Sequence, residues 1–289
     1  MISPETQKAP MKARFDWYAS TIRDSPQEVV EMLQIGLGAD TVNSSRGLHG
    51  YETRFDILTP VGVVASVLAG GANGHPNAWA SGTETDSFVE VVRGLWPADH
   101  HVSRMDTALD FDGEGSWDLL EGIALGLADR LKLKTSVAGD YHRKEDGRTL
   151  YVGSRKSNVF ARLYEKGKQL VPLAPPNVAK LISPDWCRLE AQVRPQKESR
   201  VTAATSTPEE AWGFAAFTKQ LAEECANLEV ARVPIAVWRE ADDERAFRYG
   251  IKQYGPLFAR MVEASPSRSW AVFGEIIGAA IADDRRSRG

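Results

Sequence analysis

One short segment, SRMDTALDFDG at residues 103–113, constrains the fold more than any other part of this chain. It lies in a predicted strand, His101–Asp112, and side chains of a strand alternate between its two faces. Asp106 and Asp110 therefore point to the same side as Arg104 and Ala108. Two carboxylates on one face repel each other unless a cation or an arginine lies between them. Such a face is either solvent-exposed, with Arg104 paired to Asp106, or it lines a cation site, and the segment alone leaves both open.

The surrounding pattern mixes strands and helices over the first two-thirds of the chain and is mostly helical afterwards. The expected early elements are a strand at Phe15–Ile22, a helix opening at Ser25-Pro26, a hairpin of residues 51–58 and 61–68, and a helix at Phe88–Trp96. The expected fold class is α+β, a mainly antiparallel sheet packed by helices. We expect residues 1–200 to form one domain and residues 201–289 a helical C-terminal region.

Later segments carry clear local signals. Ser116 can cap a helix, and Asp146-Gly147 is typical of a hairpin turn between strands at 136–142 and 148–153. A third strand is expected at Val159–Lys166, and a fourth at Trp186–Arg194. Thr207-Pro208-Glu209-Glu210 predicts a capped helix that continues through Leu228. Two more helices are expected at 243–263, with a break near Gly255-Pro256, and at 269–283; the last one either packs on the body or forms a homodimer seam.

Composition excludes several classes of protein. The 289 residues contain 35 Lys and Arg against 39 Asp and Glu, a net charge of −4, and no apolar run near the roughly 20 residues of a membrane span. Two cysteines are too few for a four-ligand zinc site or a disulfide framework. We expect a soluble cytoplasmic protein with no membrane partner. Charge is nevertheless uneven, because residues 143–168 hold eight basic and three acidic side chains.

Further candidate residues lie in two of the predicted strands. Glu190, in WCRLEAQVR, shares one face with Arg188 and would add a third carboxylate if its strand neighbours that of Asp110. Tyr151 and Tyr164 lie within the basic cluster, where arginine and lysine can neutralise phosphates. A tyrosine hydroxyl can act as a nucleophile when a base or a metal helps to remove its proton. The chain has no Walker A, dinucleotide-binding or G-x-S-x-G motif.

Taken in order, several segments resemble the replication initiation factor family, which includes rolling-circle initiators of plasmids and filamentous phages and related relaxases. The matching pieces cover roughly residues 15–195 and are FDWYAST, GLHGYETRF, HPNAWASGTET, SRMDTALDFDG, TLYVGSRKSNVFARLYEKG and WCRLEAQVR. The C-terminal third carries no matching motif.

The resemblance implies a metal-dependent DNA nicking and joining enzyme with a tyrosine nucleophile, acting at a replication origin in a bacterial host cell. The implied nucleophile is Tyr151, which would form a covalent 5′-phosphotyrosine intermediate. The implied ligands of a divalent metal, Mg²⁺ or Mn²⁺, are Asp106, Asp110 and Glu190. The implied DNA-binding side chains are Arg155, Lys156, Arg162, Lys166 and Arg188.

Alternatives stay open at this point. Tyr164 could be the nucleophile instead, and Glu165 a ligand or base. A relaxase for conjugative transfer would use the same chemistry. A repressor would bind DNA without cutting it, and a nuclease that uses water would cut without a covalent adduct. The expected partners are origin DNA, single-stranded at the nick, host helicase and polymerase, and a second copy of the chain.

Overall fold

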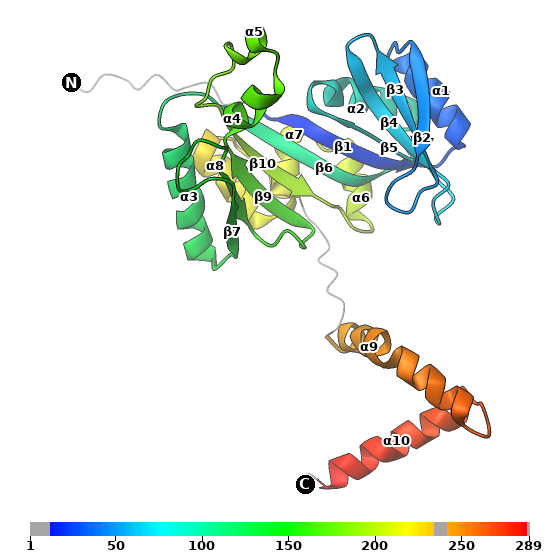
Figure 1. Ribbon diagram of the computed structural model, residues 1–289. Helices are drawn as coiled ribbons and strands as arrows, with labels where there is room; N and C mark the ends of the chain where they lie inside the picture. Colours follow the sequence, from blue (N-terminus) through cyan, green and yellow to red (C-terminus); the bar gives the residue numbers. More distant parts are fainter. Residues whose placement is uncertain (1–11, 234–241, 288–289) are drawn as a thin grey trace. The chain divides into compact units, whose positions relative to one another are not determined.

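The computed structural model describes residues 12–233 and 242–287, and the chain divides into two compact units, residues 1–236 and 237–289. The first unit is built on an antiparallel sheet of ten strands in the order β2-β3-β4-β5-β1-β6-β10-β9-β8-β7 (Figure 1). The strands are β1 (Arg14–Ile22), β2 (Thr41–Arg46), β3 (Thr53–Thr59), β4 (Gly62–Ala69), β5 (Asn77–Ser81), β6 (His100–Phe111), β7 (Thr135–Ala138), β8 (Thr149–Val152), β9 (Val159–Tyr164) and β10 (Cys187–Val193). The sheet and its helices confirm the expected α+β class.

Helices cover one face of this sheet. Its β2–β1 half is covered by α1 (Pro26–Gly36) and α2 (Thr85–Leu95), its centre by α6 (Ser199–Thr205) and α7 (Pro208–Ala211), and its β7–β10 half by α3 (Ser116–Leu131) and α8 (Ala216–Ala226). Two apolar clusters result, one around Phe15, Tyr18 and Phe88 and one around Leu109 and Leu163. Burial of these side chains supplies the main driving force for the fold. The short helices α4 (Lys166–Leu170) and α5 (Pro176–Ala179) lie in the connection between β9 and β10.

Local sequence explains where these helices begin. The Ser25 hydroxyl accepts a hydrogen bond from the Glu28 N–H at 3.2 Å, and Pro26 occupies the first turn, where its missing N–H costs nothing. Thr207 and Glu210 form the predicted reciprocal capping box at the start of α7. Helices α1 and α7 therefore start where the sequence predicts, whereas Ser116 is the first residue of α3 and does not cap it, and α2 starts at Thr85 instead of Phe88.

Two local predictions were wrong. Asp146-Gly147 does not form a tight hairpin, because β7 already ends at Ala138 and the Asp140 carboxylate accepts N–H groups of the long loop that follows. The helix that starts at Thr207 is also interrupted. A Cβ on Gly213 would lie 2.3 Å from the Ala231 carbonyl oxygen, so a returning segment packs against the backbone there, and α8 starts afresh at Ala216.

The boundary expected near residue 200 falls between β10 and α6, inside the first unit, and the two units divide at residues 236 and 237. The second unit contains α9 (Asp242–Ala264) and α10 (Trp270–Ser287). Pro256 lies inside α9 without ending it, contrary to the expected break. The rings of Phe258 and Phe273 lie 5.5 Å apart and join the two helices. Residues 234–241 lie outside the described residues.

Candidate active site

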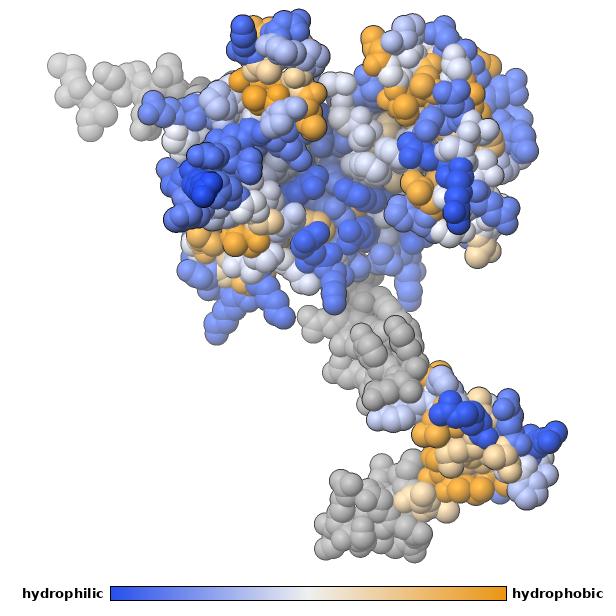
Figure 2. All heavy atoms as spheres, in the orientation of Figure 1, coloured by the Kyte–Doolittle hydropathy of each residue, from blue (hydrophilic) through white to orange (hydrophobic). Residues whose placement is uncertain are grey.

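The face of the sheet opposite the helices is polar. Cross-strand pairing places Tyr151, Arg162 and Glu190 in one row over β8, β9 and β10. A second row contains Tyr164, Arg188 and Asp110 over β9, β10 and β6. Directly opposed residues of an antiparallel sheet share a face, so these side chains all lie on the same side. In Figure 2 hydrophilic residues fill the middle of this face, which we call the open face.

Two of the expected carboxylates on this face are buried beside arginines. Asp106 is 1% exposed, and its Oδ1 accepts a hydrogen bond from Arg104 Nε at 2.9 Å. Glu190 is 0% exposed and accepts from Arg162 Nε at 2.6 Å. Burial raises the pKa of both carboxyl groups above their ordinary values, even though these arginines act in the opposite direction. Burial therefore disfavours the charged form of both carboxyl groups, and a further positive charge nearby would favour it.

Asp110 lies in a different environment. Arg188, itself 2% exposed, donates to both its carboxylate oxygens, at 2.7 and 2.9 Å, and the Trp186 indole adds a bond of 2.8 Å. Burial raises the pKa of Asp110, but these hydrogen bonds and the Arg188 charge outweigh it and bring the pKa below its ordinary value. Asp110 is thus a stable anion that holds a buried arginine in place.

A fourth carboxylate, Asp16, joins this set from β1. Its Oδ1 accepts a hydrogen bond of 2.7 Å from Arg188, and its charge raises the pKa of Asp106 and of Glu190. The sequence pattern does not predict this position of Asp16. Strict alternation would place Asp16 and Trp17 on opposite faces, and Trp17 lies on the open face. The register shift between Phe15 and Trp17 brings Asp16 to the open face as well. The one indication in the sequence that Asp16 could be functional is its position in FDWYAST, a segment that contributes to the family resemblance.

The two candidate tyrosines differ sharply in access. Tyr164 is 7% exposed, its hydroxyl donates to Glu190, and burial together with the Glu190 charge raises its pKa strongly. Tyr151 is half-buried near the end of β8, and the Arg155 guanidinium carbon lies 4.6 Å from its ring centroid. A ligand can reach Tyr151 from solvent, whereas the Tyr164 hydroxyl proton is already donated to Glu190. Of the two candidates for the predicted nucleophile, Tyr151 is therefore the more accessible one.

The remaining candidate side chains are either exposed to solvent or already paired with a neighbouring charged group. Arg155 and Lys156 are exposed in the turn between β8 and β9, and the half-buried Lys166 has its Nζ 5.6 Å from the Tyr164 ring centroid. Burial, together with the Arg188 charge, lowers the pKa of Lys166. Glu165 is 4% exposed and accepts both Arg148 Nε and Nη2, at 3.0 and 2.9 Å, so its oxygens are already occupied.

The acidic set fits a divalent cation in its chemistry. Carboxylate oxygens are the ligands that Mg²⁺ takes, and burial holds the pKa of Asp106 and of Glu190 above their ordinary values despite the neighbouring arginines. Among the residues that the structure describes, however, no three Asp, Glu, His or Cys side chains are grouped to hold one ion as they stand. Arg104 and Arg162, 29% and 32% exposed, would have to turn toward solvent or phosphate.

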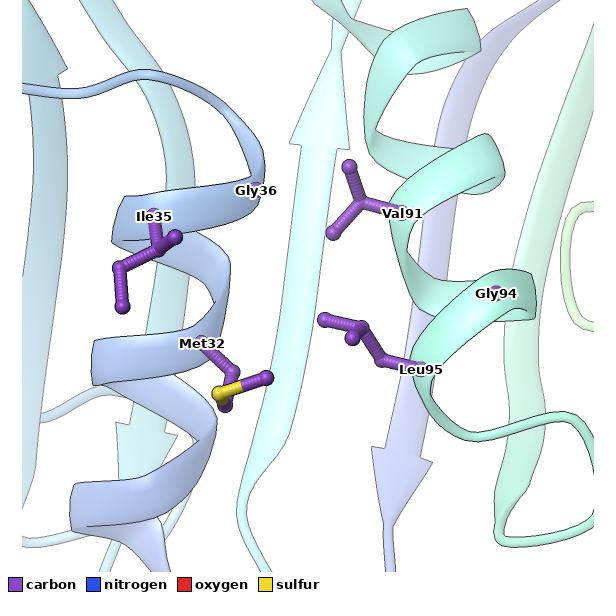
Figure 3. A pocket seen from close by; sticks show the side chains of 6 residues that line it. All are labelled: Met32, Ile35, Gly36, Val91, Gly94 and Leu95. Carbon is purple, nitrogen blue, oxygen red and sulfur yellow. The ribbon is translucent and has the colours of Figure 1, made fainter.

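A groove elsewhere offers no comparable chemistry. It lies between α1 and α2, on the helix-covered side, with a volume of about 250 Å³ (Figure 3). None of its lining residues has a polar side chain, and they are Met32, Ile35, Gly36, Val91, Gly94 and Leu95. The groups that could act on a substrate are therefore on the open face.

Comparisons with known proteins agree with this architecture. The structure of a rolling circle replication initiator protein from Geobacillus stearothermophilus superimposes with a TM-score of 0.50, at 17% sequence identity, over 78% of this chain and 100% of that chain. No curated protein sequence matches. No described helix is long and apolar enough to cross a membrane. The family model for the replication initiation factor matches residues 100–267, more than half of the chain and including every candidate except Asp16, and the protein therefore belongs to the replication initiation factor family.

Proposed function

We propose that this protein initiates rolling-circle DNA replication by nicking and rejoining one strand at an origin through a covalent 5′-phosphotyrosine intermediate. The observation that carries the proposal is the cross-strand row of Tyr151, Arg162 and Glu190, which sets an accessible phenol beside a guanidinium on the open face. Membership of the replication initiation factor family supports the same reading.

In the proposed step the Tyr151 oxygen attacks the scissile phosphorus. A phosphorus–oxygen bond to tyrosine forms, the bond to the 3′ oxygen breaks, and that oxygen takes up a proton to give a free 3′-OH. The phenolic proton passes to water, which the half-buried position of Tyr151 admits. Arg162 lies directly opposite on β9, where its charge can stabilise the oxygens of the phosphate. The phosphotyrosine conserves the bond energy, so rejoining needs no nucleotide cofactor.

A divalent metal, Mg²⁺ or Mn²⁺, would polarise the scissile phosphate. Asp106, Asp110 and Glu190 would hold it, as expected from the sequence, and Asp16 would add a fourth negative charge to the acidic set. Arg104 and Arg162 would then move to the DNA phosphates that accompany the ion. Arg188 would stay with Asp110 and Asp16, because it is buried between them.

The proposed partner is origin DNA, single-stranded at the nick and held by Arg155, Lys156, Arg162 and Lys166. Host helicase and polymerase would extend the freed 3′ end. The exposed apolar side chains of α9 and α10, among them Ile251, Leu257 and Ile276, suit a homodimer seam.

The test mixes the purified protein with supercoiled DNA of its own replicon and Mn²⁺ or Mg²⁺, followed by a denaturing gel. Tyr151→Phe should abolish the covalent protein–DNA species. Tyr164→Phe should keep it, and so should the control Tyr141→Phe, whose ring packs against Trp117 of α3.

Each other result points elsewhere. Loss of the adduct in Tyr164→Phe alone would move the nucleophile to β9. Nicking without any adduct would indicate a nuclease that uses water. Binding of origin DNA with neither nicking nor adduct would overturn the enzymatic proposal and leave a repressor. A relaxase would give the same adduct, and transfer genes beside its own gene would identify it.

A further inference from the structure

Two tryptophans stand together on the open face, in the half of the sheet away from Tyr151. Trp17 of β1 and Trp79 of β5 stack with ring centroids 4.4 Å apart and an interplanar angle of 7°. Both are half-buried. Large aromatic side chains usually pack into a core, as Phe15 and Tyr18 of the same strand do on the covered face. This pair is instead left on the polar side, without a covering helix.

Arginines extend this stack at both ends. The Arg104 guanidinium carbon lies 4.6 Å from the Trp17 ring centroid, and that of Arg54 lies 5.4 Å from the Trp79 ring centroid. Their side chains are 29% and 25% exposed, so both can reach solvent. The result is a column of two aromatic planes between two cations, and each cation is also paired with a carboxylate, Arg104 with Asp106 and Arg54 with Asp56. A base can therefore stack on the outer face of an indole only where its arginine swings aside toward solvent or a phosphate. Stacked bases and their phosphates are the complementary ligand, because bases stack on aromatic planes and phosphates pair with arginine.

The Trp17 indole also has an unused donor. Its Nε1 is buried and has no hydrogen-bond partner among the described residues, a property it shares with Trp212 of the core. The indoles of Trp96, Trp117 and Trp186 donate to carboxylates instead. A buried N–H without an acceptor costs free energy, and an acceptor on a bound ligand would remove that cost once the side chains that cover the nitrogen move aside.

The column is close to the proposed reaction centre. Trp17 pairs directly with Asp106 of β6, and Arg104 binds both the Trp17 ring and the Asp106 carboxylate. Four inter-strand steps separate β1 from β8, the strand of Tyr151, which corresponds to roughly 19 Å across the sheet. An extended single strand crosses that distance in a few nucleotides. One strand could therefore contact both places.

We infer that Trp17 and Trp79, with Arg54 and Arg104, form a stacking site for unpaired bases of the strand whose scissile phosphate lies at Tyr151. The inference rests on the proposed function for its substrate. It adds a second contact region for DNA. Of its four residues, only Arg104 lies within residues 100–267, the part of the chain that matches the family model. Because every base has a flat face, this region should bind with little sequence preference.

The experiment measures binding of two fluorescein-labelled 20-mers to the Tyr151→Phe protein, in which the proposed chemistry is blocked. One is oligo(dT), and the other has the same backbone with abasic sugars throughout. We expect oligo(dT) to bind on the order of 10-fold more tightly. Adding Trp79→Ala should remove that preference, and Trp79→Phe should restore most of it because phenylalanine also stacks. Adding Arg155→Ala with Lys156→Ala should weaken both probes equally, since it removes only phosphate contacts.

Thermal melting of each variant controls for folding, and Trp79→Phe keeps the test valid if Trp79→Ala unfolds. Equal binding of the two probes by the Tyr151→Phe protein, or an unchanged preference in Trp79→Ala, would overturn the stacking site even if the wild-type protein forms its adduct. A preference that depends on Trp79, in a protein that forms no adduct on origin DNA, would keep the stacking site and reject the proposed function.

Discussion

The helix-covered face and the open face of the sheet carry side chains from the same strands, but the first is packed with apolar side chains and the second with charged ones. On β9, Leu163 points into an apolar cluster beneath α3 and α8, while Arg162 and Tyr164 on either side of it point to the open face. The covered face excludes water with hydrophobic side chains. The open face buries carboxylates under arginines and leaves their charge only partly balanced. Substitutions on the first face should reduce stability, and those on the second should reduce activity.

The largest change in stability among these variants is expected from Leu163→Ala, on the helix-covered face. Leu163 is 0% exposed, and truncation should lower the free energy of unfolding by about 2–5 kcal/mol through lost burial and a cavity. Urea denaturation measures the loss, and nicking per folded molecule should stay near wild type. A drop in nicking without a drop in stability would mean that the two faces do not divide as described.

Glu190→Gln, on the open face, should change activity much more than stability. Glutamine has the same shape and can still accept the Tyr164 hydroxyl, and Arg162 reaches solvent, so stability should change by about 1 kcal/mol or less. If the proposed site is right, nicking should fall on the order of 100-fold, because a buried charge beside the proposed position of the scissile phosphate is lost. Single-turnover nicking assays and urea melts on the same preparation compare the two quantities. A large stability loss with normal nicking would assign Glu190 to the scaffold.

The pH dependence of two carboxylates should run in opposite directions. The pKa of Asp106 is raised above its ordinary 3.8, so its ionisation costs the folded state stability as pH rises through that raised pKa. The pKa of Glu165 is lowered below 4.5 by Arg148 and Lys168 despite burial, so its contribution is present above pH 4.5 and is lost as pH falls through the lowered value.

Asp106→Asn should therefore gain stability relative to wild type as pH rises from 4 to 7. Glu165→Gln should be weakened most at pH 7, by about 1–3 kcal/mol, and less at acidic pH. Urea midpoints at four or five pH values would show the two trends. Parallel trends for both variants would contradict the assignment of these two environments.

The smallest effect is expected from the exposed turn between β8 and β9. Replacing Arg155 and Lys156 by alanine should leave stability unchanged and reduce the slope of log affinity against log salt by about 1.4, at ~0.7 for each single-strand phosphate contact. Oligonucleotide titrations between 50 and 300 mM salt measure it. An unchanged slope would place the DNA path away from this turn.

Much of the fold could be predicted because strong local signals agree with the final packing. The alternation in β6 predicted that Asp106 and Asp110 share one face, and Glu190 was expected to join them if its strand lay beside theirs. The pairing of β10 with β6 confirms both points. Their roles as metal ligands remain a prediction. Short edge strands such as β2, TVNSSR, have no apolar alternation and gave no signal, because both of their faces are largely exposed.

What escaped prediction depends on contacts far apart in sequence. Asp16 reaches the open face through a register shift against β6, and the helix that starts at Thr207 is interrupted where residues near Ala231 return to pack on the Gly213 backbone. The environments of Asp110 and Asp106 also differ through partners on other strands, Arg188 in one case and Arg104 in the other. A linear pattern can place a carboxylate on a face, but it does not show which cation lies beside it.

The open face has a topological consequence for a circular substrate. A closed circle of DNA has no end to thread, so a protein that enclosed its strand would have to come apart to admit it. Here no described helix crosses the face that carries Tyr151, Glu190 and Trp17, and an uninterrupted strand can be laid onto it sideways. Tyr151 is on β8, one strand from the β7 edge, so the proposed point of covalent attachment lies close to the rim of the sheet.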